Sequence, residues 1–267
     1  MKREIKISIA IMIGSLSFLW LEKPLKLYLS EYWVDLSVAK QISAIAVRSI
    51  LIATTFMFIK HLHLLHFTGL DTWKNIKNIQ ATLIALVFIM VGISNHWNTY
   101  VSAGANLLLL FAISTLTVGI FEELLFRGLV FPLFIQSFSK TKGAFWWSAI
   151  LSSLCFGTMH FINIFSQPEN FVGILSQVFF ATSIGVFFCG LMVRTEHILI
   201  PMLIHALVNF GFGADELKVI TEIKEASTSG VNWNSLIPTT LFFSFIFAGG
   251  IFMIQKADQT HLLNKLK

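Results

Sequence analysis

Long apolar stretches are the feature that most constrains the fold of this chain. Eight of them can be counted, and each is close to the roughly 17–25 residues that an α-helix needs to cross a bilayer. Only 12% of the residues are charged, against about 25% in soluble domains. We therefore predict an all-α fold, a polytopic transmembrane helix bundle of about eight spans. The stretches cover approximately residues 5–21, 41–60, 80–95, 104–121, 143–162, 171–193, 196–212 and 234–255.

The lysines and arginines are distributed unevenly between the two sides of this bundle. If the N-terminus is cytoplasmic, the inside segments hold Lys2, Arg3, Lys6, Lys60, Lys74, Lys77, Lys140, Lys142, Arg194, Lys256, Lys265 and Lys267. The outside loops then hold only Lys23, Lys26, Lys40, Lys218 and Lys224. This bias follows the positive-inside rule and predicts that both termini are cytoplasmic. No small-residue cleavage site follows the first apolar run, so we expect it to be retained as a span.

The net charge of +5 does not indicate a nucleic-acid partner. The basic residues are scattered between apolar runs, and no basic stripe with stacking aromatic residues appears. We expect the partners to be the lipid bilayer and a peptide or protein substrate. Cys155 and Cys189 lie in apolar stretches and form no CxxC pair, so a disulfide framework is not expected.

The segment Phe121–Gly128 places three ionisable side chains in a stretch that otherwise resembles a membrane helix. A charge at the bilayer centre costs roughly 2.5–3.5 kcal/mol on insertion scales, so each charge needs a partner or a function. Glu123 and Arg127 are four residues apart with the acid first, the favourable order for a helical ion pair. Glu122 lies about 100° around the helix and is less easily reached by Arg127. We predict that Glu123 is structural and that Glu122 is available for chemistry.

Further polar residues lie in later apolar stretches. Counted from the turn near residues 140–141, Glu122 is about 18 residues back and His160 about 20 residues forward, so two antiparallel helices would hold them at nearly the same depth. His205 and Asn209 are four residues apart and share one helical face. We expect these four side chains to line one polar cavity.

This set of groups favours a hydrolase that activates water. A carboxylate in apolar surroundings suits a general base, and a histidine can hold the water or carry its proton. A second histidine with an asparagine can donate N–H groups to the oxyanion of a tetrahedral intermediate. Zinc held by Glu122, His160 and His205 is the alternative, because carboxylate oxygen and histidine nitrogen are ordinary zinc ligands.

Other polar residues have simpler interpretations. His61, His63 and His66 follow the second span, where amphipathic side chains belong at the membrane interface, and no acid or cysteine stands at metal-ligand spacing. Arg48 is alone in its span, and we expect it to reach the interface or to pair with an acid that the sequence does not identify. The charged run 215–225 predicts a solvated outer loop. The zinc motif His-Glu-x-x-His, the serine turn Gly-x-Ser-Gly and the aspartyl form Gly-x-Gly-Asp do not occur.

Three motifs resemble those of one known family. The sequences Glu122-Glu-Leu-Leu-Phe-Arg127, Phe156-Gly-Thr-Met-His160 and His205-Ala-Leu-Val-Asn209 are similar to the signatures EExxxR, FxxxH and HxxxN. These belong to the CAAX proteases and bacteriocin-processing enzymes, also called the CPBP or Abi family, which includes the type II CAAX prenyl endopeptidase. The resemblance divides the chain into N-terminal spans (1–103), a catalytic core (104–212), and an outer loop with the last span (213–267).

The resemblance implies an all-helical intramembrane endopeptidase. It implies that Glu122 and His160 activate water, that Glu123 and Arg127 support them, and that His205 and Asn209 bind the oxyanion. Both a metal-dependent and a metal-free mechanism have been argued for the family. We favour no metal cofactor, because Asn209 is a poor zinc ligand.

Short loops and the absence of eukaryotic targeting motifs suggest a bacterial cytoplasmic membrane, where prenylated substrates are not expected. The resemblance then implies processing of a peptide pheromone, a bacteriocin or a CAAX-like substrate. A non-catalytic bacteriocin-immunity or scaffold protein of the same fold is the alternative, but a scaffold has no need for buried charges. A transporter is disfavoured because neither an inverted repeat nor paired broken helices are present.

Overall fold

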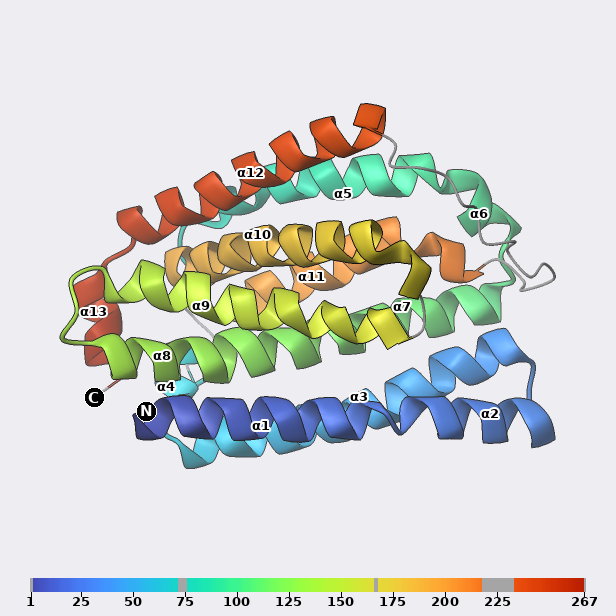
Figure 1. Cartoon of the computed structure of the whole chain (residues 1–267), viewed down its shortest axis with the longest axis horizontal. Helices are drawn as coiled ribbons and strands as arrows, with labels where there is room; N and C mark the ends of the chain where they lie inside the picture. Colours follow the sequence, from blue (N-terminus) through green and yellow to red (C-terminus); the bar gives the residue numbers. More distant parts are fainter. Residues whose placement is uncertain (1, 72–75, 166–167, 218–232, 267) are drawn as a thin grey trace.

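The computed structural model describes residues 2–71, 76–165, 168–217 and 233–266, and these form helices and connecting turns without a strand. The predicted all-α membrane bundle is confirmed. Its long helices run side by side along the longest axis of the molecule (Figure 1). The elements are α1 (Arg3–Leu19), α2 (Glu22–Tyr32), α3 (Leu36–His61), α4 (Leu65–Thr68), η1 (Ile79–Thr82), α5 (Leu83–Asn95), α6 (Trp97–Ser102), α7 (Ala105–Glu123), η2 (Leu124–Val130), α8 (Phe131–Phe138), α9 (Ala144–Met159), η3 (His160–Phe165), η4 (Pro168–Asn170), α10 (Phe171–Thr195), α11 (Leu199–Phe212), η5 (Ala214–Leu217), α12 (Trp233–Lys256) and α13 (Gln259–Asn264).

Every predicted apolar stretch is helical, but the helices differ in length. Within the described residues, six helical segments are long and apolar enough to cross a membrane. The stretches predicted at 80–95 and 196–212 form shorter apolar helices, Ile79–Asn95 and Leu199–Phe212. At a 1.5 Å rise, the 14 residues of α11 extend about 21 Å, less than the roughly 30 Å hydrocarbon core. α11 by itself is therefore too short to cross the hydrocarbon core.

The acidic motif lies in the middle of one continuous helical segment. The helical segment Ala105–Phe138 comprises α7, η2 and α8 and is 34 residues long, which confirms that the helix continues past the motif to Pro132. The η2 part is a π-helix. Pro132 lacks an N–H group, and its ring would clash with the carbonyl of Gly128 in a regular α-helix, which explains why the preceding turn is wider. π-Helical turns are frequent at functional sites.

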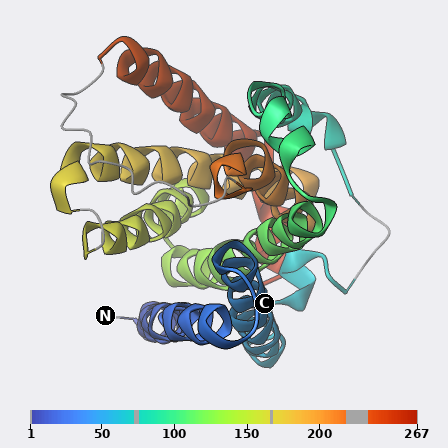
Figure 2. The ribbon, with the colours of Figure 1, turned by 90° about the vertical axis from the view of Figure 1, so that its right-hand side faces the viewer.

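Small residues allow the helices that carry the site to approach closely. A Cβ atom at Gly119 of α7 would lie 2.7 Å from both the Met202 carbonyl oxygen and the Ala206 nitrogen of α11. A Cβ atom at Gly157 of α9 would lie 2.7 Å from the Val178 carbonyl oxygen of α10. Such contacts are typical of membrane helices, where close backbone packing drives association. Viewed end-on, α11 lies inside the bundle, surrounded by the other helices (Figure 2).

Both chain ends lie at the same end of the bundle (Figure 1), which we call the terminus end. Lys2 Nζ donates a hydrogen bond to the Ser137 carbonyl oxygen, and Gln136 Nε2 donates to the Leu266 carbonyl oxygen at 3.2 Å. These contacts join the first and last helices to the end of α8.

Glu196 joins three segments at the terminus end. Its carboxylate lies 2.8 Å from Lys77 Nζ, 3.0 Å from Lys265 Nζ and 3.2 Å from His261 Nε2. Burial would raise the pKa of Glu196, but the hydrogen bonds and charges of Lys77 and Lys265 outweigh it and hold the pKa below its ordinary value. Its backbone is left-handed, with φ 54°, so the carboxylate reaches both flanking segments from a tight turn.

We predict that Glu196→Gln lowers the stability of the purified protein by about 1 kcal/mol, because two charge-assisted hydrogen bonds weaken while half-exposed partners are screened by solvent. A lowered pKa means that the ionised carboxylate stabilises the fold above its unfolded pKa of about 4.3, and that this contribution is lost as the pH falls through the lower folded value. Thermal unfolding in detergent from pH 3 to 7 measures this. The variant should differ from wild type at pH 7 and converge with it below pH 4, roughly. Glu4→Gln, at the same end, is the control. It should change neither the stability at pH 7 nor the dependence of stability on pH.

Candidate active site

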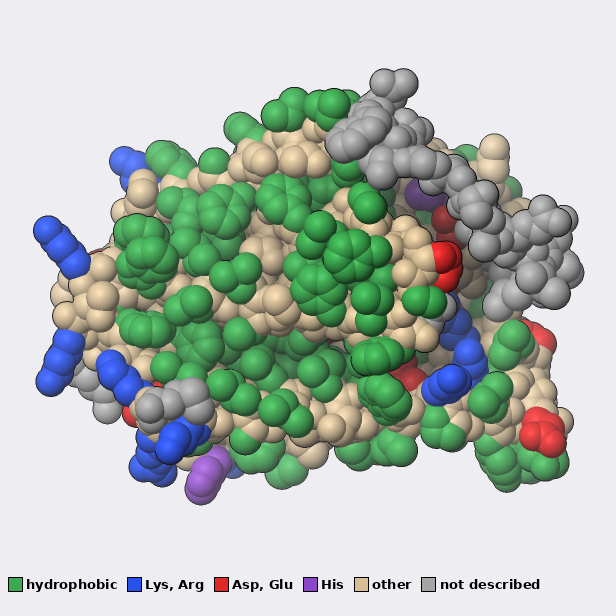
Figure 3. Space-filling view, in the orientation of Figure 1, with side chains coloured by type: hydrophobic (Ala, Val, Ile, Leu, Met, Phe, Trp, Pro, Cys, Tyr) green, Lys and Arg blue, Asp and Glu red, His purple; other side chains and the backbone are tan. Residues whose placement is uncertain are grey.

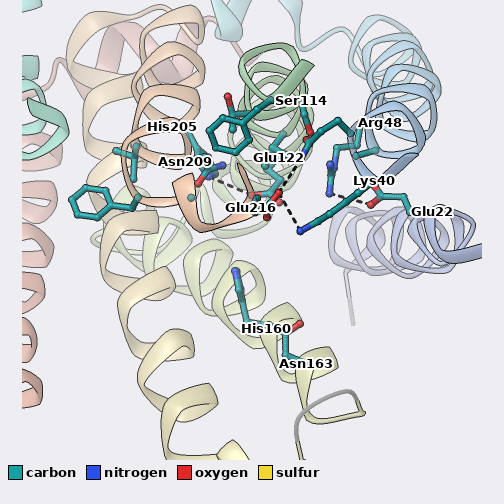
Figure 4. Close-up of a pocket in the computed structure, with 18 of the residues that line it drawn as sticks. Glu22, Lys40, Arg48, Ser114, Glu122, His160, Asn163, His205, Asn209 and Glu216 are labelled. Carbon is teal, nitrogen blue, oxygen red and sulfur yellow. Dashed lines mark hydrogen bonds and ion pairs between the residues drawn. The ribbon is translucent and has the colours of Figure 1, made fainter. Parts of the chain in front are cut away.

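A cavity of about 560 Å³ opens at the end of the bundle opposite the termini, which we call the mouth end. Glu122, His160, His205 and Asn209 all line it, so the structure brings the four predicted side chains to one space (Figure 4). They come from α7, the α9–η3 junction and α11.

Glu123 lies beneath the cavity floor and is fully buried. One of its carboxylate oxygens, Oε1, accepts a hydrogen bond from Arg127 Nη1 at 2.9 Å and another from His205 Nδ1 at 2.8 Å. The ion pair predicted from the four-residue spacing is therefore present, with both side chains 0% exposed. His205 is a second partner of Glu123 that the spacing did not predict.

Arg127 is held by more than its ion pair. Its Nη2 donates to the Gly185 carbonyl oxygen of α10 at 3.0 Å. Its guanidinium carbon lies 4.8 Å from the ring centre of Phe156 and 5.4 Å from that of Phe188. Cation–π contacts of this kind partly replace the lost hydration of a buried cation. A Cβ at Gly185 would come within 3.0 Å of Nη2, so glycine leaves the space that the guanidinium occupies.

Glu122 has a different environment from its neighbour. Its side chain is 26% exposed and faces the cavity. Its nearest charged partner is His205, whose Nε2 lies 3.5 Å from Glu122 Oε2, a distance longer than a normal hydrogen bond. The Glu123 carboxylate is therefore bonded to buried partners, and the Glu122 carboxylate is accessible to water or a ligand.

His205 is oriented from both sides. The Glu123 carboxylate accepts the proton of Nδ1, which directs Nε2 toward Glu122. The ring stacks on Phe188 at a centroid distance of 4.9 Å and meets Phe156 edge to face at 5.9 Å. When the imidazole carries both protons, Nε2 can donate toward the cavity while Nδ1 keeps its bond to Glu123.

His160 and Asn209 line the cavity without joining this hydrogen-bonded group. The only side-chain hydrogen bond of His160 within the described part of the chain is from Nδ1 to the Phe156 carbonyl oxygen, at 3.2 Å. That bond leaves Nε2 as an acceptor, and the ring is directed toward the cavity from the opposite wall to His205 (Figure 4). Asn209 lies one turn beyond His205 on α11, half-buried at the cavity wall.

The cavity mouth contains charged residues from outside the motifs, and we call Glu22, Lys40, Gln41, Arg48 and Glu216 the mouth group. Arg48 Nη2 lies 3.2 Å from Glu22 Oε2, so Glu22 is the acid partner that the sequence did not identify. Sequence reasoning could have searched the preceding segment for it, because a cation this far inside a span needs a nearby acid.

Glu216 belongs to the run predicted as a solvated outer loop, and its side chain is 44% exposed. Its Oε2 lies 3.2 Å from Lys40 Nζ and 3.4 Å from Gln41 Nε2, at the cavity wall. Ala214 and Leu217 of the same η5 turn are buried with Tyr100 and Phe111, and they hold η5 against the bundle. Residues 218–225 of the same run lie outside the described residues.

The residues offered as possible metal ligands do not fit a metal site. Within residues 2–71, 76–165, 168–217 and 233–266, no group of three His, Cys, Asp or Glu side chains could hold a metal ion. Both nitrogens of His205 face carboxylates, and His160 points from the opposite wall. His61, His63 and His66 are exposed, and His66 Nδ1 pairs with Asp71 at 2.8 Å, in keeping with an interfacial position.

Part of the chain matches a known protein family. Residues 104–211 match the family described as type II CAAX prenyl endopeptidase Rce1-like. The match confirms the resemblance to the CAAX proteases for this segment and identifies it as a protease domain of that family. No curated protein and no solved structure matches the chain. α1, α2, α3 and η5 lie outside the matched residues, although α2, α3 and η5 carry the mouth group.

We predict that Arg127→Ala reduces stability by about 3–5 kcal/mol, because it leaves the buried carboxylate of Glu123 without its cation. Glu123→Gln combined with Arg127→Gln removes both charges and should recover much of the lost abundance, which shows as coupling between the two positions. Membrane accumulation and thermal unfolding in detergent measure this. Equal losses in the single and the double variant would contradict the assignment of the pair as structural.

We predict that Gly119→Ala pushes α7 away from α11 and reduces stability by about 1–3 kcal/mol, the usual range for overpacking. The contact between Glu123 and His205 should loosen with it, because these residues lie on the same two helices. Gly14→Ala is the matched control, since a Cβ there meets nothing within 4 Å, and alanine should be neutral or slightly stabilising in a helix. Similar unfolding temperatures for the two variants would show that the close approach at Gly119 is not needed.

Proposed function

We propose that this chain is an intramembrane endopeptidase in which Glu122 activates a water molecule for attack on a peptide bond. The observation that carries the proposal is the difference between the two adjacent acids. Glu123 is 0% exposed and accepts from Arg127 and His205, whereas Glu122 is 26% exposed and faces the cavity. Only Glu122 can therefore accept a proton from a water molecule that also touches a substrate.

The proposed reaction uses each cavity residue in turn. Glu122 removes a proton from water, and the water oxygen bonds to the carbonyl carbon of the scissile peptide. The oxyanion that forms accepts hydrogen bonds from Asn209 Nδ2 and from protonated His205 Nε2. The C–N bond then breaks, and the leaving nitrogen takes the proton held by Glu122. His160 Nε2 accepts a hydrogen bond from the attacking water and orients it.

Glu123 and Arg127 act through His205 in this proposal and are positioning residues. The Glu123 carboxylate fixes the ring orientation and stabilises the doubly protonated imidazole, as a buried carboxylate does for the histidine of a catalytic triad. Arg127 holds the Glu123 carboxylate in place by its ion pair, and its own position is fixed by the bond to α10. The proposed reaction uses no metal, because Glu122, His160 and His205 are not arranged as the ligands of a metal site.

The chain is an integral membrane protein with a CAAX-type protease domain. We propose that it resides in a bacterial cytoplasmic membrane with both termini cytoplasmic, supported by the uneven distribution of lysine and arginine. We also propose that the substrate is a membrane-associated peptide or protein, such as a peptide pheromone or bacteriocin precursor. This is supported by a site reached through a cavity inside a membrane bundle.

We predict that Glu122→Gln abolishes cleavage, with a loss of at least about 10²-fold, because the variant keeps the size of the side chain but not its basicity. His205→Ala and Asn209→Ala should each lower turnover by about 10²–10³-fold if they bind the oxyanion. The measurement is a quantitative comparison of peptides in membranes that contain wild-type or variant protein, with thermal unfolding to show that each variant is folded.

Glu31→Gln is the control, because this acid lies on α2 away from the cavity lining. A peptide that accumulates with wild type and Glu31→Gln but not with Glu122→Gln is the expected product. Near-normal turnover in Glu122→Gln, or a strict requirement for Glu123 alone, would show that the roles of the acids are reversed. Stoichiometric zinc, with activity lost on chelation and restored by metal, would replace the proposed mechanism.

A further inference from the structure

Among the described residues, the lining of the cavity reaches one end of the bundle, the mouth end. Its lining residues lie in the mouth-end halves of α3, α10, α11 and the segment Ala105–Phe138, in α2 and η5, and at the α9–η3 junction. The space-filling view shows a hollow with charged side chains at this end, far from the end where the termini lie (Figure 3). Glu122 forms the inner limit of this hollow, near the midpoint of the 34-residue segment Ala105–Phe138.

Toward the terminus end the site is sealed by apolar side chains. Leu124, Leu125, Phe126, Leu129 and Val130 follow the acidic motif and are between 0% and 3% exposed. They belong to the main hydrophobic cluster, which also includes side chains of α3, α8 and α9. Among the described residues, the cavity that contains Glu122 has no lining residue beyond this layer. Substrate and water must therefore reach Glu122 from the mouth end.

The two ends differ in positive charge. The helix ends and turns of the terminus end carry ten described cations: Lys2, Arg3, Lys6, Lys60, Lys77, Lys140, Lys142, Arg194, Lys256 and Lys265. At the mouth end, α2 and the first turns of α3 carry Lys23, Lys26 and Lys40, and Arg48 lies farther along α3 in the cavity wall. Lysine and arginine accumulate on the cytoplasmic side of membrane proteins, so this asymmetry orients the terminus end toward the cytoplasm.

We infer that the site opens to the non-cytoplasmic side of the membrane, and that its substrate is a peptide segment already translocated across that membrane. This inference rests on the proposed peptidase activity and specifies where it occurs. A translocation step must then supply the substrate, and the cleaved segment is released on the non-cytoplasmic side.

The mouth group fits such a substrate. Its ion pairs, Glu22 with Arg48 and Lys40 with Glu216, line the path between bulk water and Glu122. Lys40 and Glu216 are 43% and 44% exposed, whereas Arg48 and Glu22 are 20% and 23% exposed, so the charged path continues inward. Charged, hydrated walls accept the polar backbone of a peptide and the water that the reaction consumes.

Cysteine labelling in spheroplasts tests the inference independently of any cleavage assay. Lys40→Cys places a thiol at the mouth, and Lys140→Cys places one in the turn between α8 and α9 at the terminus end. A membrane-impermeant charged maleimide should label Lys40→Cys in intact spheroplasts, and Lys140→Cys at least about tenfold less until the membrane is permeabilised, because charged reagents do not cross a bilayer. The wild-type chain, with Cys155 and Cys189 inside membrane helices, gives the background.

Labelling of Lys140→Cys but not Lys40→Cys in intact spheroplasts would overturn the inference. Failure of Lys40→Cys to react in intact spheroplasts, whatever happens after permeabilisation, would also overturn it. A second measurement locates the product. Peptides that depend on Glu122 should appear in the medium around spheroplasts and not in the cytosol, and the opposite distribution counts against the inference. If labelling succeeds but no peptide depends on Glu122, the orientation stands and the proposed peptidase function fails.

Discussion

One oxygen atom of Glu123 connects the parts of the site. It accepts hydrogen bonds from Arg127 on its own helical segment and from His205 on α11. In a bundle interior without water, an ionised carboxylate is tolerated only with such partners, and losing one leaves a buried charge. The same contact turns His205 so that Nε2 faces Glu122. Glu123 thus occupies Arg127 and orients His205, and Glu122 is left facing the cavity.

This contact depends on how closely the helices pack. In lipid there is no hydrophobic force between helices, so backbone approach at small residues brings them together. Gly119 lets α7 lie against the backbone of α11, and Gly185 leaves room on α10 for the guanidinium of Arg127. The π-helical turn after the motif widens the helix where Pro132 would otherwise clash. A widened helical turn and space in the packing therefore both occur next to the two acids.

The site is not confined to the segment that matches the protease family. The floor of the cavity, with the acids and histidines, comes from residues within 104–211, but α2, α3 and η5 build much of its mouth. Reaction chemistry and access are thus carried by different parts of the chain. In the reaction we propose, water and a peptide approach Glu122 past the mouth group, whose charges are paired.

The sequence by itself determined the membrane bundle, the Glu123–Arg127 pair and four of the residues that line the cavity: Glu122, His160, His205 and Asn209. Apolar length and helical spacing are local properties, so a span and a four-residue ion pair can be predicted without knowing the neighbours. The bond from His205 to Glu123 joins residues 82 positions apart, and the Glu22–Arg48 and Lys40–Glu216 pairs depend on which helices become neighbours. Whether an acid is buried or open to a cavity also depends on those neighbours. Only the tertiary structure decided these features, because helix periodicity places a side chain on a face and does not specify what that face meets.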